Sequence, residues 1–362
     1  MNKKAKLRLD WVDAIKGITV LLVALHHGWL ALTLYNPNLY EQIGSVAHTF
    51  ERADFFIGLA RMPAFFICSG IVFSLVSRNK FEWYFTKRVP FIVWNILLWT
   101  AFSYGFELAG IHMYPWKSHP FFENSVFVFT APYGNLWFLY AILLLSGYAI
   151  VISRFSVQKQ ILITLASSFI LMLSTRYFPY PDNSQMMLVK NLAYKGLIFF
   201  MFGAWFAPAI IETLKQTRKV SLLALALFAF FIIMHQLFGD MSGYMQIFLL
   251  TFPLTMVFIY LIVMGSKMPW FTKLFSHIGA YSLEIFITHQ FFIAYIYHLA
   301  QTHNLPDSPY LQMVIISVLP VVLCAITCVV LGSYVRPYLF TPPQAFKLLV
   351  GKVTTLKRTT AN

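Results

Sequence analysis

Charged residues are scarce in this chain of 362 residues: Asp, Glu, Lys and Arg make up 11% of it, whereas hydrophobic residues make up 59%. A soluble globular domain is excluded by that shortage, because charged residues are about a quarter of the composition of such domains. The mean hydropathy of +0.69 agrees. The composition therefore predicts an all-α, polytopic membrane protein.

Cysteine is also rare. The three cysteines, Cys68, Cys324 and Cys328, all lie in apolar segments and lack the spacing of metal ligands. This excludes a disulfide framework and gives no support to a zinc site, so we expect no metal. A P-loop and a Rossmann fingerprint are likewise missing, which argues against nucleotide hydrolysis and redox chemistry.

Acidic residues are few, 13 against 27 Lys and Arg, and the formal net charge is +14. A basic surface for nucleic acid needs a soluble face or tail, but here the basic residues lie in short loops between apolar runs. We therefore expect no nucleic-acid partner and interpret these residues as orientation signals in a lipid bilayer. The first apolar run is long and has no small-residue cleavage site after it, so we expect it to be retained as a helix.

Ten segments are long and apolar enough to be candidate membrane spans. They are approximately residues 15–35, 53–77, 89–109, 134–153, 161–176, 191–211, 221–238, 244–265, 278–300 and 310–332. With the N-terminus inside, 21 of the 27 Lys and Arg fall in cytoplasmic pieces, which places both termini in the cytoplasm by the positive-inside rule. No linker or internal repeat divides the chain, so we expect one membrane domain over residues 1–340 and a basic cytoplasmic tail over 341–362.

Ionisable side chains at membrane depth are costly, and each is a candidate functional residue. In the first span Lys16 and His27 are eleven residues apart, so both lie on one helix face, about 16 Å from each other. His26 points about 80° away from that face, and we expect it to bond a neighbouring helix.

Two later spans carry further candidates. In the second span Asp54 and Arg61 are seven residues apart and share a face. Pro63 can bend this helix on the C-terminal side of both residues. In the ninth span His289 lies near mid-depth. Glu284 lies about 140° around that helix from His289, so a direct Glu–His pair has little support.

Five segments follow one another along the chain in a recognisable order. The first, "KGITVLLVALHH", is a basic residue followed by ten residues and a histidine, and after it come "RMPAFFICSG", "FTKRVPFIVW", "NLWFLYAILL" and "YSLEIFITHQFF". In this order they resemble the motifs of the integral-membrane acyltransferase family 3, in particular its fucose 4-O-acetylase-like inner-membrane branch. Lys16 replaces the arginine that is more usual in the first motif, which keeps the charge but loses the bidentate geometry.

The resemblance implies an O-acyltransferase of the bacterial inner membrane, which moves an acetyl group from cytoplasmic acetyl-CoA to a hydroxyl of a glycan or lipid-linked sugar. His27 then corresponds to the essential histidine of the family. The residues expected at the reacting group are His27, Arg61 and His289, and those expected to bind coenzyme A are Lys16, Arg78, Lys87 and Arg88. Four points stay open: the acceptor, the length of the acyl group, whether the mechanism passes through an acyl-histidine or a ternary complex, and the oligomeric state.

Two other classes remain. A proton-coupled transporter would use His27, Asp54, Arg61 and Glu284 as a relay, but the inverted repeats and paired broken helices typical of such proteins are not evident in the sequence. A non-catalytic assembly factor would tolerate the loss of His27.

Overall fold

The computed structural model describes residues 9–76, 79–113, 134–177, 184–214, 217–238, 246–303 and 305–348, and within these ranges the chain is helical with no strand. The first half contains α1 (Asp10–Tyr35), α2 (Leu39–Leu75), α3 (Lys80–Trp83), η1 (Tyr84–Arg88), α4 (Val89–Leu108), η3 (Gly134–Leu136), α5 (Trp137–Ile152) and α6 (Val157–Tyr177). The second half contains α7 (Ser184–Asn191), η4 (Leu192–Gly196), α8 (Leu197–Thr213), α9 (Thr217–Phe238), η5 (Gln246–Thr251), α10 (Phe252–Gly265), α11 (Pro269–Ala280), α12 (Ser282–Thr302), α13 (Pro309–Met313), η6 (Val314–Val318), α14 (Leu319–Val335) and η7 (Arg336–Phe340).

The all-α, polytopic membrane fold is confirmed. Within the described ranges, seven helices are long and apolar enough to cross a membrane, or eight if a pair bent by 120° counts as one span. Over their described residues all ten predicted segments are helical, but three do not pass as full spans on their own, and residues 244–265 pass only together with the bent helix α11. The apolar part of α9 covers only Ser221–Leu237, and α12 carries Glu284, His289 and Gln290 in its first half.

Two helices differ from their predicted ranges. α2 begins at Leu39, 14 residues before the predicted residue 53, and it is kinked at Ile43, whose backbone is not helical. Leu39, Ile43 and Ala47 are buried, which explains why the chain stays packed beyond the continuous apolar run. The loop predicted after residue 265 is instead α11, which starts with Pro269 in its first turn, a favourable position for proline. The segment between the predicted spans 89–109 and 134–153 and the predicted tail 341–362 lie largely outside the described residues.

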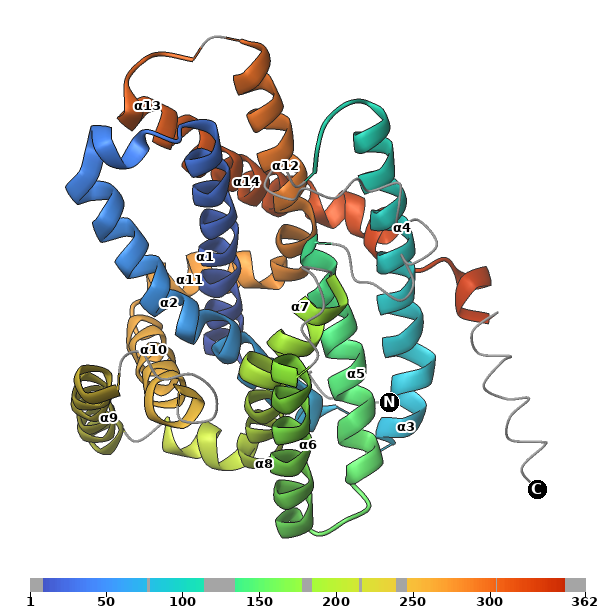
Figure 1. Cartoon of the computed structure of the whole chain (residues 1–362). Coiled ribbons are helices and arrows are strands. Elements are labelled where there is room, and N and C mark those ends of the chain that lie inside the picture. The colour runs from blue at the N-terminus through green and yellow to red at the C-terminus, as the bar shows by residue number, and fades with distance from the viewer. Residues whose placement is uncertain are drawn as a thin grey trace.

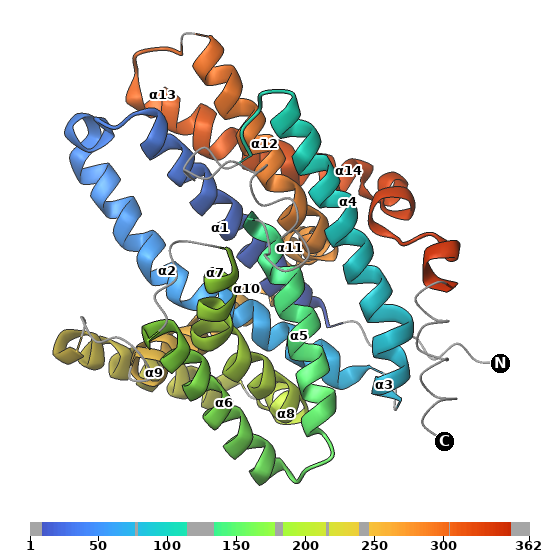
Figure 2. The same cartoon turned by 45° about the vertical axis from the view of Figure 1, so that its right-hand side comes forward.

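The first helix lies at the centre of one half of the bundle. Figures 1 and 2 both show α1 between α2 and α12, and α1 packs against each of them and against α11. The contact with α11 is a close approach of two backbones: a Cβ added to Gly279 would lie 1.7 Å from the carbonyl oxygen of Asp13. Such approaches of small residues are typical of helix packing in membranes.

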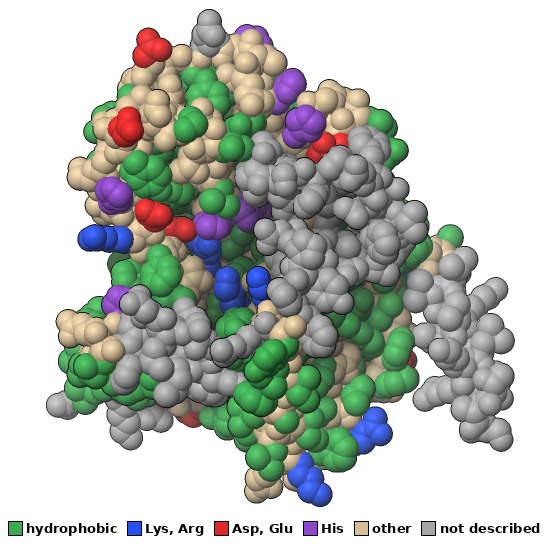
Figure 3. All heavy atoms as spheres, viewed as in Figure 1, with side chains coloured by type: hydrophobic (Ala, Val, Ile, Leu, Met, Phe, Trp, Pro, Cys, Tyr) green, Lys and Arg blue, Asp and Glu red, His purple; other side chains and the backbone are tan. Residues whose placement is uncertain are grey.

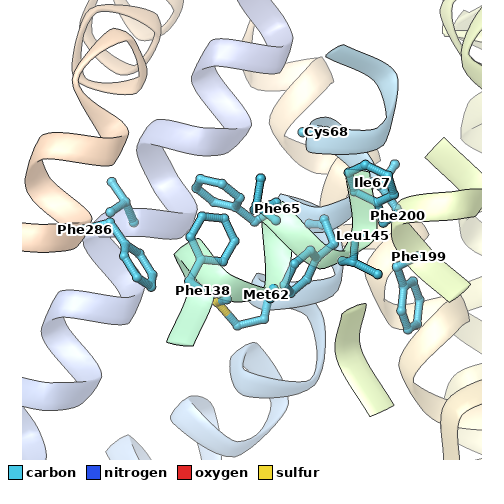
Figure 4. Close-up of a cluster of buried hydrophobic side chains, with 14 of the residues drawn as sticks. Met62, Phe65, Ile67, Cys68, Phe138, Leu145, Phe199, Phe200 and Phe286 are labelled. Carbon is cyan, nitrogen blue, oxygen red and sulfur yellow. The ribbon is translucent and has the colours of Figure 1, made fainter. Parts of the chain in front are cut away.

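The main core joins α2, α5, α8 and α12. Figure 4 shows Phe65, Phe138 and Phe286 turned toward one another, and the ring centroid of Phe138 lies 4.8 Å from that of Phe65 and 4.7 Å from that of Phe286. All three side chains are buried. Because Phe286 lies one helical turn before His289, this packing holds the part of α12 that carries the histidine.

Most of the described π-helical turns are explained by proline. A proline follows two residues after the end of η1, η5 and η6, and η7 contains one. Proline clashes with the carbonyl four residues earlier and donates no hydrogen bond, so the turn before it widens. The turn η4, Leu192–Gly196, has no proline inside it or in the following ten residues.

Candidate functional site

Two histidines from distant parts of the chain meet between α1 and α12. Nδ1 of His27 lies 2.8 Å from Nε2 of His289. The two rings are nearly parallel, at 3°, with their centroids 5.1 Å apart. The sequence predicts that both residues lie at the reacting group. In the structure they are joined by a direct hydrogen bond.

The hydrogen bonds of the pair define the tautomer of each neutral ring. Nδ1 of His289 lies 3.0 Å from the carbonyl oxygen of Ile285, so it must carry a proton and donate. Nε2 of His289 is then an acceptor, and Nδ1 of His27 donates to it. The lone pair of His27 is therefore on Nε2. His289 is fully buried, whereas His27 is partly exposed.

Buried amide side chains fix α12 around His289. Nδ2 of Asn135 donates to the carbonyl oxygens of Phe286, at 2.7 Å, and of Ile287, at 3.1 Å. Nε2 of Gln290 donates to the carbonyl oxygen of Met113 at 2.6 Å. These bonds tie the backbone and side chains beside His289 to other segments, so the second histidine is held from several sides.

A second polar network lies next to the histidine pair. Asp54 accepts a hydrogen bond from Nη1 of Arg61 through one oxygen and contacts Nδ1 of His26 through the other, both at 2.6 Å. Nη1 of Arg61 also lies 3.5 Å from the carbonyl oxygen of Leu22 on α1. The shared face of Asp54 and Arg61 and the bond from His26 to a neighbouring helix are as the sequence predicts.

Lys195 adds a second cation to this network. It lies in η4, which packs against α2, and it is close enough to Arg61 and Asp54 to interact electrostatically with both. No described residue bonds its ammonium group. Figure 3 shows basic, acidic and histidine side chains gathered in the middle of one face of the molecule. Lys195 is not among the residues that the sequence predicts for the site.

Glu284 belongs to a separate ion pair. Its carboxylate accepts a hydrogen bond from Nε of Arg336, and Nη2 of Arg336 donates to the carbonyl oxygen of Ala280 at 2.6 Å. The guanidinium also lies 4.9 Å from the centre of the Tyr281 ring. Glu284 therefore fastens the start of α12 to the end of the last long helix, and the relay expected of a transporter gains no support from it.

Of the residues expected to bind coenzyme A, the three that the structure describes lie in two separate places. Lys16 forms an ion pair with Asp13 at 2.6 Å on the face of α1 that also carries His27. Lys87 is exposed at the end of η1, and the Arg88 guanidinium lies 5.5 Å from the centre of the Trp83 ring. Arg78 lies outside the described residues.

A cavity of about 310 Å³ lies between α1, α2, α8, α9 and α10, away from the histidines. Its lining is apolar and includes Trp11, Cys68 and Met256 but none of His27, Arg61 and His289. Over the ranges that the structure describes, no group of three His, Cys, Asp or Glu side chains is arranged to hold a metal ion.

Lys195, Asn135 and Arg336 are among the network residues that were absent from the predicted site. A sequence signal existed for Lys195, because it is a lysine within an otherwise apolar segment. The segment "GNLWFLY" that contains Asn135 is equally compatible with an interfacial aromatic belt. The partner of Arg336 cannot be found from helical periodicity.

Comparisons with known proteins identify related sequences. A family model described as an acyltransferase domain matches residues 9–335. The chain is 24% identical over 365 residues to the inner membrane protein YcfT of Escherichia coli (strain K12), an alignment that covers 92% of this chain and 96% of YcfT. No solved structure matches the chain. The family match covers almost all of the described helices, including both members of the histidine pair, and so the chain belongs to the integral-membrane acyltransferase family 3.

Proposed function

We propose that this protein is an O-acetyltransferase that moves an acetyl group from cytoplasmic acetyl-CoA to a hydroxyl of a glycan or other cell-envelope acceptor. The family match establishes a membrane acyltransferase in general. The apolar helices and the similarity to an inner membrane protein are those of a multi-pass inner-membrane protein. The acetyl group, the coenzyme A donor and the acceptor are the parts that we add.

The observation that carries the proposal is the His289–His27 hydrogen bond. A general base for acyl transfer must present a basic nitrogen in a fixed orientation. The hydrogen bond from Nδ1 of His289 to the Ile285 carbonyl oxygen fixes the orientation of the His289 ring. The hydrogen bond between the two histidines then fixes the orientation of the His27 ring. Nε2 of His27 is thereby the basic atom, in the manner in which an orienting group prepares the histidine of a catalytic triad.

In the proposed reaction Nε2 of His27 takes the proton of the acceptor hydroxyl while the hydroxyl oxygen attacks the thioester carbonyl. A carbon–oxygen bond forms, the carbon–sulfur bond breaks, and His27 returns the proton to the coenzyme A thiolate. A cation beside the carbonyl oxygen stabilises the intermediate. We assign that role to Arg61, whose Nη1 is occupied by Asp54 and whose fork carries further donors.

The donor is proposed to enter from the cytoplasmic side. Lys16 lies about 16 Å from His27 along one face of α1, a separation suited to a phosphate at one end and a thioester at the other. Lys87 and Arg88, at the start of α4, and Arg78 would bind the remaining phosphates. Both assignments rest on the predicted orientation, with the N-terminus inside.

The test uses membranes that contain the full chain and acetyl-CoA labelled in its acetyl group. We expect label in the lipid, glycan or protein fraction, and a loss of about 10²- to 10⁴-fold in His27→Ala, the usual contribution of a general base. His26→Ala, at an equal amount of protein, is expected to retain most of the activity. Equal losses in both variants would mean that packing explains the pair, and label that does not depend on His27 would overturn the proposed function.

A further inference from the structure

Counted over the described residues, the network around Asp54 contains more positive than negative charge. Arg61 is 7% exposed and pairs with Asp54, which is its only described carboxylate partner. Lys195 interacts electrostatically with the same two residues. Two cations and one carboxylate leave a net charge of +1 if His26 is neutral. An uncompensated charge at membrane depth is costly, so such groups face a partner or a water-filled pathway.

The backbone at Lys195 is a second, independent observation. Lys195 lies in η4, the π-helical turn that no neighbouring proline explains. π-helical turns are rare and are frequently found at functional sites, because they redirect a side chain without ending the helix. Here the turn lies where the α7–α8 helix packs against α2 and brings an ammonium group toward the Asp54 network.

The position of Lys195 along its helix points to the acceptor side. It lies 18 residues before the end of α8 at Thr213, or about 27 Å along a helix axis, so it is near the outer end of the span in the predicted orientation. Coenzyme A enters from the opposite end under the proposed function. An anion that reaches Lys195 would therefore belong to the acceptor.

We propose that Lys195 binds an anionic group of the acceptor, a phosphate or a carboxylate, next to the hydroxyl that is acetylated. This inference rests on the proposed function for the identity of the ligand as acceptor. The missing negative charge of the network is then supplied by the substrate. A neutral sugar lacks that charge and binds more weakly.

The experiment measures anion binding to the purified full-length protein in nanodiscs of phosphatidylcholine, from the shift of its thermal unfolding midpoint at constant ionic strength. Pyrophosphate represents a lipid-linked sugar diphosphate, glucuronate represents an acidic sugar, and glucose is the neutral control. We expect saturable stabilisation by at least one of the two anions and none by glucose. The anion that binds identifies the source of the charge.

Three variants test whether Lys195 binds the anion. Lys195→Gln should raise the Kd of the anion by about ten- to a hundredfold, the value of a charged hydrogen bond. Lys190→Gln removes the same charge from an exposed position five residues earlier and should leave the Kd unchanged. Asp54→Asn should lower the Kd, because it removes the carboxylate that competes for the cations, and a purely structural role would not give that sign.

Two results would overturn the inference: no saturable stabilisation by either anion, or an equal Kd in the wild type and in Lys195→Gln. If Asp54→Asn does not fold, the comparison of the two lysine variants still decides. The proposed function fails separately, if anion binding is present but acetyl-CoA gives no label that depends on His27.

Discussion

The hydrogen bond between the two histidines allows the role of His289 to be tested apart from that of His27. In His289→Ala, Nδ1–H of His27 loses its acceptor, and both tautomers of His27 become accessible. Losing one hydrogen bond of this kind costs about 0.5–1.5 kcal/mol. If that cost falls on the transition state, kcat decreases by about 2- to 13-fold. This is smaller than the loss expected for His27→Ala, because the base itself remains.

The KM for acetyl-CoA should not change, since the proposal places His289 against His27 and not against the donor. His289→Gln offers an amide oxygen in place of Nε2 and should recover part of the rate. The matched control is His298→Ala, nine residues later and on the opposite side of α12. Initial rates with labelled acetyl-CoA at equal protein amounts measure all three variants.

The role of His289 in orienting His27 is refuted if His289→Ala keeps the full wild-type kcat. It is also wrong if His298→Ala loses as much activity as His289→Ala, because the effect would then come from general damage to α12. A rise in KM with unchanged kcat would place His289 in donor binding instead of in orientation of the base.

Further outcomes are expected from the other parts of the protein. Lys16→Ala should mainly raise the KM for acetyl-CoA, and a change confined to kcat would contradict its role at the phosphates. Arg61→Ala should mainly lower kcat, by about 2.7–4 kcal/mol of activation free energy if it acts as one oxyanion donor, and an unchanged kcat would remove it from that role. Gly279→Ala should lower the thermal unfolding midpoint, with a cost of about 1–3 kcal/mol for the overpacking, because its new Cβ would meet the backbone of α1; a midpoint equal to the wild type would show that the contact is relaxed. Alkaline phosphatase fused after Gly110 should be active and after Lys273 inactive, and the reverse pattern would reject the predicted orientation.

Much of the fold was accessible from hydropathy, because a bilayer imposes a minimum length on every apolar helix. Over their described residues all ten predicted segments are helical for that reason. The number of full spans was less accessible. α12 combines Glu284 and His289 with apolar residues, and hydropathy alone cannot distinguish a helix shielded by its neighbours from one that faces lipid. α11 was missed because its packing on α1 depends on contacts distant in sequence.

The candidate site was predictable where the residues concerned lie on a single helix. Helical geometry selected His27 over His26 and placed Asp54 and Arg61 on one face, where they form an ion pair. Contacts between helices were not predictable in the same way. The pairing of Glu284 with Arg336 spans 52 residues and that of His27 with His289 spans 262, and no periodicity relates residues on different helices. The π-helical turn at Lys195 has no recognisable sequence pattern.

The separation of the two histidines also determines when the site can exist during biosynthesis. His27 is made 262 residues before His289, which corresponds to about 13–50 s of translation. Throughout that interval the first helix is in the membrane without the partner that orients its imidazole. A ribosome that stops early releases a chain that has Lys16 and His27 but no fixed base. Under the proposed function, the acyl donor meets a competent histidine only after nearly the whole protein has been synthesised, and incomplete copies do not consume it.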